Sequence, residues 1–129
     1  MFTKLLTVAA STALLFSIAG CAPTNTTTEM VEQGQVETIM YEQIIDVRTL
    51  EEWNEGHLEG AVRIGIESPD FTSQLEQLNK TGDYFIYCRS GNRAGRAIEI
   101  MRELGFTGEL VNGGSVAEAS AILNANVVK

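Results

Sequence analysis

The residues best suited to chemistry lie in one short segment, Cys88-Arg89-Ser90-Gly91-Asn92-Arg93. A cysteine thiolate is a strong nucleophile, and nearby cations and helix N-termini favour the thiolate over the thiol. Gly91 and Asn92 tolerate unusual backbone angles, so the segment can curl and direct several amide N–H groups at the sulfur atom. We therefore expect Cys88 to be a nucleophile within a loop, residues 89–93, that binds an anionic substrate.

The elements on either side of this loop place it at an edge where ligands bind. Residues 84–87 are a short apolar run typical of a buried strand, and a helix is predicted after Cys88. The apolar residues of that helix recur at helical spacing, and Gly105 stands where a left-handed C-cap is expected. Ligands bind beyond the carboxyl ends of parallel strands, where helix N-termini offer free amides. Cys88 is predicted to lie at such a position.

The rest of the chain indicates an α/β fold. Ser68-Pro69-Asp70 is a helix start signal, with Pro69 predicted at the first helical position, and a short helix is predicted over residues 49–55. The predicted strands are residues 36–40, 44–47, 61–64, 84–87 and 109–111. Strands that alternate with helices predict a three-layer sandwich, in which a central parallel sheet of about five strands has helices on both faces. We assign this domain to residues 35–129.

The first residues have the pattern of an export signal. Lys4 precedes an apolar run over residues 5–19, which is too short to span a bilayer comfortably. Ile18-Ala19-Gly20-Cys21 resembles the bacterial lipobox, in which a signal peptidase cuts before the cysteine and the new N-terminus receives lipid. Residues 1–20 are thus predicted to be a lipoprotein signal peptide, and Cys21 the lipidation site. The alternative is an ordinary secretory cleavage site that happens to contain a cysteine.

After Cys21, residues 22–34 are rich in Thr, Asn, Glu and Gln and have almost no apolar pattern. We interpret residues 21–34 as a flexible linker between a lipid anchor and the domain. The mature protein is therefore expected in the cell envelope or periplasm, attached to a membrane through lipid alone and otherwise a monomer.

The cysteine count limits the possible chemistry. The chain has 2 cysteines, so lipidation of Cys21 would leave Cys88 as the single thiol. That excludes an internal disulfide, a CxxC redox motif and a thiolate-clustered metal site, and no metal or cofactor is expected. A buried structural cysteine is the alternative interpretation of Cys88.

The distribution of charge points to a small anionic ligand. With 9 basic and 17 acidic residues the net charge is −8, so nucleic acid is not expected as a partner. Four of the 9 basic residues nevertheless follow Cys88 closely: Arg89, Arg93, Arg96 and Arg102. A local positive patch on an acidic protein can attract a small anion.

Three motifs together resemble the rhodanese family, the thiosulfate sulfurtransferases and their single-domain relatives, from about residue 36 to the C-terminus. They are Ile44-Ile45-Asp46-Val47-Arg48 with Glu51-Glu52-Trp53, then Gly56-His57-Leu58-Glu59-Gly60-Ala61, and Tyr87-Cys88-Arg89-Ser90-Gly91-Asn92-Arg93-Ala94. The chain departs from the family after Asn112-Gly113-Gly114, where many relatives have a Trp and this sequence continues Ser115-Val116-Ala117-Glu118.

The resemblance implies a rhodanese-like fold and a two-step transfer of sulfane sulfur. The Cys88 thiolate would take the outer sulfur of thiosulfate or a similar donor and pass it from a persulfide to cyanide or a thiol. The amides and side chains of the loop would bind the donor and stabilise the charge on sulfur: Arg89, Ser90, Gly91, Asn92 and Arg93.

The remaining polar residues of the motifs are expected to be structural. Asp46 and Arg48, at a strand end, are interpreted as an ion pair and loop cap. His57 is the only histidine, and we assign it a packing role, because a thiolate held by amides and cations needs no general base. Trp53 is predicted to pack against the core or cover it.

Two other functions remain open at this stage. A cysteine phosphatase or arsenate reductase also uses a thiolate in an amide loop closed by Arg, but the phosphatase motif is Cys-x5-Arg. Here Arg93 follows Cys88 after only four residues, and Ala94 stands at the phosphatase position. The second alternative is a non-catalytic module that binds a protein or carries a persulfide.

Overall fold

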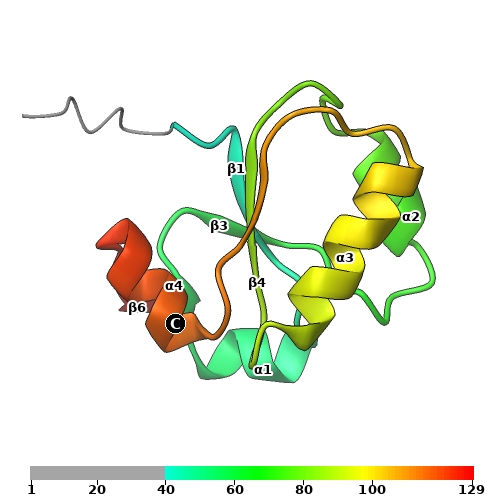
Figure 1. Cartoon of the computed structure of the whole chain (residues 1–129). Helices are drawn as coiled ribbons and strands as arrows, with labels where there is room; N and C mark the ends of the chain where they lie inside the picture. Colours follow the sequence, from blue (N-terminus) through cyan, green and yellow to red (C-terminus); the bar gives the residue numbers. More distant parts are fainter. Residues whose placement is uncertain (1–39) are drawn as a thin grey trace, which may run out of the picture. The chain divides into compact units, whose positions relative to one another are not determined.

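A four-stranded parallel sheet forms the centre of the computed structural model, which describes residues 40–129. Its spatial order is β3-β1-β4-β5, and every neighbouring pair is parallel (Figure 1). The strands are β1 (Gln43–Asp46), β3 (Ala61–Arg63), β4 (Tyr84–Tyr87) and β5 (Leu110–Asn112). The predicted parallel α/β fold is confirmed, with four strands in the described sheet rather than about five. The fifth predicted strand, residues 36–40, lies outside the described residues except for Met40, which is not in a strand.

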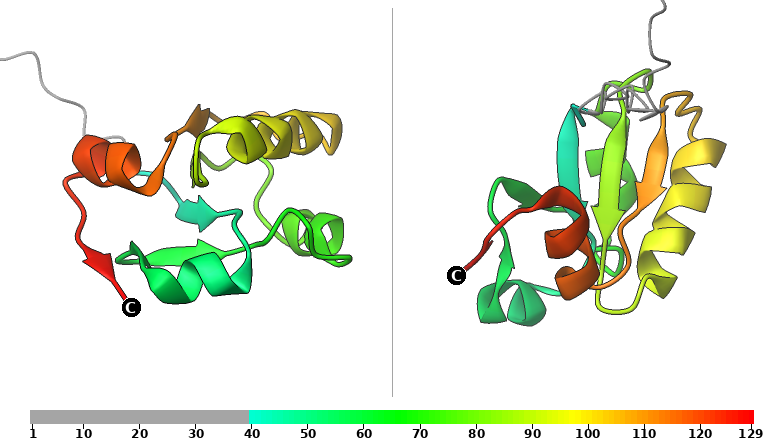
Figure 2. Two further views of the ribbon diagram at one scale, coloured as in Figure 1. Left: turned by 90° about the horizontal axis from the view of Figure 1, so that it is seen from below. Right: turned by 60° about the vertical axis from the view of Figure 1, so that its left-hand side comes forward.

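Helices cover both faces of this sheet. The bounds are α1 (Leu50–Glu55), α2 (Phe71–Glu76), α3 (Asn92–Glu103) and α4 (Val116–Leu123). On one face Phe71 and Leu75 of α2 pack with Ala97 and Met101 of α3 in a single apolar cluster. On the other face Ala119 of α4 packs in a second cluster. The two layers of helices are separated by the strands (Figure 2).

The central strand β4 contributes to both clusters because successive side chains of a strand point to opposite faces. Tyr84 and Ile86 belong to the cluster with α2 and α3, and Phe85 and Tyr87 to the cluster with α4. All four residues are buried. This burial explains why residues 84–87 form an apolar run without alternation.

The ends of the helices follow local sequence signals, with one exception. Gly105 has the left-handed φ of +93° beyond α3, as predicted, and the helix predicted over residues 49–55 begins at Leu50 because Thr49 is its N-cap. The prediction for Pro69 was wrong: α2 begins at Phe71 with Asp70 as N-cap, so Pro69 precedes the helix. The Phe71 N–H donates to the Ser68 carbonyl, which closes a turn before α2 and delays its start.

A second, smaller sheet was not predicted from the sequence. Strands β2 (His57–Leu58) and β6 (Val127–Val128) pair antiparallel. Two-residue strands are too short to show an alternating pattern. Among residues 40–129, none of the helices has both the length and the apolar character needed to span a bilayer.

Candidate active site

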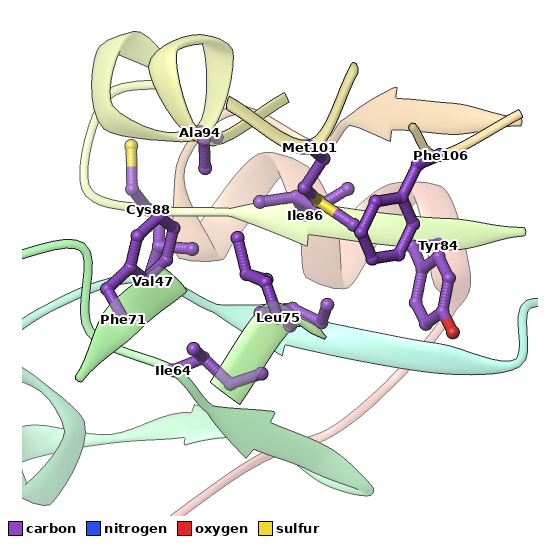
Figure 3. Packing of buried hydrophobic residues seen from close by; sticks show 12 residues of the cluster. Val47, Ile64, Phe71, Leu75, Tyr84, Ile86, Cys88, Ala94, Met101 and Phe106 are labelled. Carbon is purple, nitrogen blue, oxygen red and sulfur yellow. The ribbon is translucent and has the colours of Figure 1, made fainter. Parts of the chain in front are cut away.

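Cys88 lies directly beyond the carboxyl end of β4, in the cluster shared with α2 and α3. It is a free thiol with a relative exposure of 0%. Its sulfur points toward the loop that leads into α3, away from Leu75 and Ile64 (Figure 3). The Cys88 N–H donates to the Gly114 carbonyl over 3.0 Å, which ties the base of the loop to the segment after β5.

The loop turns back on the sulfur at Gly91. This residue has the left-handed φ of +89°, and its N–H donates to Cys88 Sγ over 3.0 Å. A Cβ at this position would also lie 3.3 Å from Gly114 Cα, so a larger residue would be strained and crowded. The side chains of Arg89, Ser90 and Asn92 are exposed. Of the predicted binding residues, Gly91 is the one whose backbone N–H donates a hydrogen bond to the sulfur in the described structure.

Asn112 holds the loop in this shape, a role that sequence reasoning missed. Its Nδ2 donates to the Gly91 carbonyl over 2.9 Å, and its Oδ1 accepts from the Gly114 N–H over 3.0 Å. Gly91 and Gly114, the two residues that Asn112 contacts, each form a hydrogen bond with Cys88. The Asn112-Gly113-Gly114 motif was visible in the sequence, but nothing there showed that the side chain faces the loop.

Arg93, in the first turn of α3, is held by Glu52 of α1. Arg93 Nη1 and Nη2 each donate to a separate carboxylate oxygen of Glu52 over 2.7 Å. The paired guanidinium lowers the pKa of Glu52 to about 2. The same carboxylate raises the pKa of Arg93, and the charges of Cys88 and Glu67 raise it by smaller amounts. Arg93 thus lies in the first turn of the helix that follows the Cys88 loop, but its charge is shared with a carboxylate that was not predicted.

The sequence profile of the Rhodanese-like domain matches residues 25–120. The chain belongs to the rhodanese-like family. Escherichia coli thiosulfate sulfurtransferase PspE is 32% identical over 66 residues, which are 51% of this chain and 64% of that protein. The Bacillus subtilis putative sulfurtransferase YtwF is 38% identical over 74 residues, which are 57% of this chain and 70% of that protein. The chain covers less of the B. subtilis putative sulfur carrier protein YrkF, 33% of its length, at 33% identity.

Known structures support the same fold. The Alr3790 protein from Anabaena sp. matches with a TM-score of 0.59 and 27% identity, over 69% of this chain and 78% of that chain. A structure of rhodanese with anions from E. coli matches with a TM-score of 0.55 and 27% identity, over 67% of this chain and 96% of that chain. The rhodanese-like fold predicted from the motifs is confirmed.

In this rhodanese-like domain Asp46 and Arg48 form the predicted ion pair and loop cap. They are buried, with exposures of 0% and 6%, and Arg48 Nη2 lies 2.6 Å from Asp46 Oδ2. Arg48 Nη2 also donates to the Gly56 carbonyl over 2.7 Å, and the Tyr87 hydroxyl accepts from the Leu58 N–H over 3.0 Å. Burial raises the pKa of Tyr87. This network joins β1, β2 and β4 beneath the loop.

His57 and Trp53 have packing roles, as predicted. Their rings stack with centroids 3.5 Å apart and an interplanar angle of 7°. His57 Nδ1 lies 3.1 Å from the Trp53 carbonyl oxygen, within hydrogen-bonding distance. In the described part of the chain, no hydrogen bond joins His57 to Cys88, so the geometry contains no Cys-His dyad.

A hollow of about 340 Å³ opens beside the loop, between the end of β5 and α4. Its lining includes Asn112 and Gly114, which both contact the Cys88 loop, and the exposed Ile122 of α4. Glu118, in the first turn of α4, also lines it. Residues 40–129 contain no cluster of three or more His, Cys, Asp or Glu that could hold a metal ion.

Proposed function

We propose that this rhodanese-like domain is a sulfurtransferase in which Cys88 becomes a persulfide. The main observation is the 3.0 Å hydrogen bond from the Gly91 N–H to Cys88 Sγ, at the start of α3. An amide and a helix N-terminus aimed at sulfur stabilise negative charge on it, whether as thiolate or as persulfide. The sulfurtransferase names of PspE and YtwF support the same proposal.

The reaction has two balanced steps. The Cys88 thiolate attacks the outer sulfur of thiosulfate, a bond forms between the two sulfur atoms, and the S–S bond of the donor breaks as sulfite leaves with its electron pair. Cyanide or a thiolate then attacks the outer sulfur of the persulfide. The bonding electron pair returns to Cys88 as thiolate, and thiocyanate or a new persulfide departs.

Burial of the sulfur imposes a condition on this mechanism. Cys88 has an exposure of 0%, so a donor can reach Sγ only after the covering side chains move. Arg89, Ser90 and Asn92 have exposed side chains at this loop and at the start of α3, so they can move without uncovering the apolar core. We infer that they contact the donor, together with Gly91 and Arg93.

The decisive experiment compares two chemistries on the full chain purified in detergent. Thiosulfate should add the mass of one sulfur atom, localised to Cys88 by peptide mapping, and cyanide should remove it with formation of thiocyanate. Aryl phosphate should be hydrolysed far more slowly, because the loop between Cys88 and Arg93 is one residue shorter than the phosphatase motif requires. A phosphatase rate above the sulfur-transfer rate would refute the proposal.

A second candidate is a persulfide carrier or non-catalytic binding module, favoured by the full burial of Cys88. The matched protein YrkF is named a putative sulfur carrier. A carrier would accept sulfur once from a partner persulfide and give no sustained thiocyanate production. Turnover with excess thiosulfate and cyanide separates the two candidates.

We also propose that the protein is exported and lipid-anchored at Cys21, with residues 1–20 as signal peptide and residues 21–34 as linker. Cys21 lies outside the described residues, so the proposal depends on the lipobox-like sequence and its apolar run. Each buried CH2 of an acyl chain contributes about 0.8 kcal/mol, so a multiply acylated cysteine holds a protein on a membrane.

Cys21→Ser should therefore release the protein from the membrane fraction or leave the signal peptide uncleaved. Fractionation with immunoblotting measures the first outcome, and N-terminal mass spectrometry the second. Sulfur loading of Cys88 should be unchanged and serves as the control for folding. Normal cleavage and membrane retention of Cys21→Ser would contradict the anchor.

A further inference from the structure

The ion pair between Glu52 and Arg93 places a negative charge at the edge of the Cys88 loop. Both side chains are partly buried, with exposures of 20% and 22%. Glu52 belongs to α1, which lies across the carboxyl ends of the strands, and Arg93 to the first turn of α3 (Figure 1). The two helices meet at the edge of the sheet where Cys88 is located.

This pairing changes the electrostatics expected from the sequence alone. Arg93 binds both oxygens of Glu52, so its positive charge is largely offset before any anion arrives. The charges of Cys88 and Glu67 also act on Arg93. A bound donor therefore meets the exposed Arg89, an Arg93 whose charge is already offset, the carboxylates of Glu52 and Glu67, and the thiolate itself. Repulsion among these charges grows with each negative charge on the donor.

We propose that Glu52 is a specificity-determining residue that disfavours doubly charged donors such as thiosulfate and leaves singly charged sulfane donors favoured. This inference rests on the proposed function. The favoured class comprises organic persulfides and thiosulfonates, in which the transferable sulfur is bonded to a second sulfur that carries an organic group, and the donor has a single negative charge.

The transfer balances for these donors as it does for thiosulfate. The Cys88 thiolate attacks the terminal sulfur of R–S–S⁻, the S–S bond of the donor breaks, and R–S⁻ leaves with its electron pair. An aryl thiosulfonate reacts in the same way and releases an aryl sulfinate. In each case the Cys88 thiolate gains one sulfur atom and becomes a persulfide anion.

Glu52→Gln removes the charge while keeping the local structure. Glu52 also accepts from the Thr49 N–H over 3.2 Å in the capping box of α1, and Gln satisfies the same cap. Its amide oxygen can still accept one hydrogen bond from Arg93. Glu51→Gln is the matched control, because Glu51 is exposed in the same helical turn and makes no hydrogen bond to Arg93 in the described structure.

The test uses the full chain in detergent, with cyanide as the acceptor. It measures kcat/KM for two donors: thiosulfate, which has two negative charges, and benzenethiosulfonate, which has one. Glu52→Gln should raise kcat/KM for thiosulfate about tenfold and for benzenethiosulfonate only about threefold. Added salt should reduce the gain for thiosulfate, because screening weakens the repulsion being removed. Glu51→Gln should leave the ratio of the two donors unchanged. The proposal would be overturned if Glu52→Gln raised kcat/KM equally for both donors. It would also be overturned if the ratio of kcat/KM for thiosulfate to that for benzenethiosulfonate were the same in Glu52→Gln and Glu51→Gln.

A second readout does not depend on sulfur transfer. Iodoacetate and iodoacetamide are similar in size and differ by one negative charge, so their relative rates at Cys88, followed by peptide mapping, report the local field. Glu52→Gln should raise the iodoacetate to iodoacetamide ratio about threefold, and Glu51→Gln should not change it. If no chain loads sulfur but this ratio still shifts, the proposed function fails while the charge at the site is verified. An unchanged ratio refutes the role of Glu52 whether or not sulfur is transferred.

Discussion

Cys88→Ser is expected to abolish sulfur loading and transfer while leaving the fold intact. Ser is close to Cys in size, and the side chain occupies a site with 0% exposure, so the packing is nearly preserved. A hydroxyl at this position is neither ionised nor able to form a persulfide, however well the Gly91 N–H is placed. Intact mass before and after thiosulfate should show no gain, and thiocyanate formation should fall to background.

The controls for this variant separate chemistry from folding. Circular dichroism and the thermal midpoint should match the parent chain closely, and iodoacetamide should no longer label the Cys88 peptide. Cys21→Ser, which retains Cys88, should still load sulfur. Transfer by Cys88→Ser above background would show that Cys88 does not hold the sulfur, and the function proposed here would be wrong.

Arg48→Met is expected to lower the free energy of unfolding by about 3–5 kcal/mol, because it leaves the buried Asp46 carboxylate without its charged partner. Asp46 has an exposure of 0% and accepts from the Arg48 side chain through both oxygens. Arg48 also holds the Gly56 carbonyl. Urea unfolding monitored by circular dichroism measures the loss.

Two further variants show whether the loss has this cause. Arg96→Met makes the same substitution at an exposed position of α3, and it should change stability by no more than about 0.5 kcal/mol. The double variant Asp46→Leu with Arg48→Met removes both charges, and it should be less destabilised than the sum of the single variants. A small effect of Arg48→Met alone would contradict the assignment of this pair as the support beneath the loop.

Local sequence signals predicted the elements that bear the site. The apolar run at residues 84–87, the glycine within the loop and the helical spacing after it identify β4, the Cys88 loop and α3 before any tertiary contact is known. These features depend on backbone preferences and on burial of one or both faces, which act over a few residues. The departure at α2 is also local: a closed turn moved its start two residues past Pro69.

The sequence alone predicted the parallel α/β fold and singled out Cys88 and its loop as the candidate site; only the tertiary structure decided which distant residues complete that site. Because β1 and β4 are neighbours in the sheet, the segments that follow them meet at one edge. This arrangement lets Glu52 form an ion pair with Arg93, 41 positions away in the sequence. The pairing of β5 with β4 likewise brings Asn112 within hydrogen-bonding distance of Gly91, 21 positions away. Such contacts depend on strand order, which no local pattern specifies. For the same reason, the full burial of Cys88 and the pairing of β2 with β6 emerge only once all the elements have packed together.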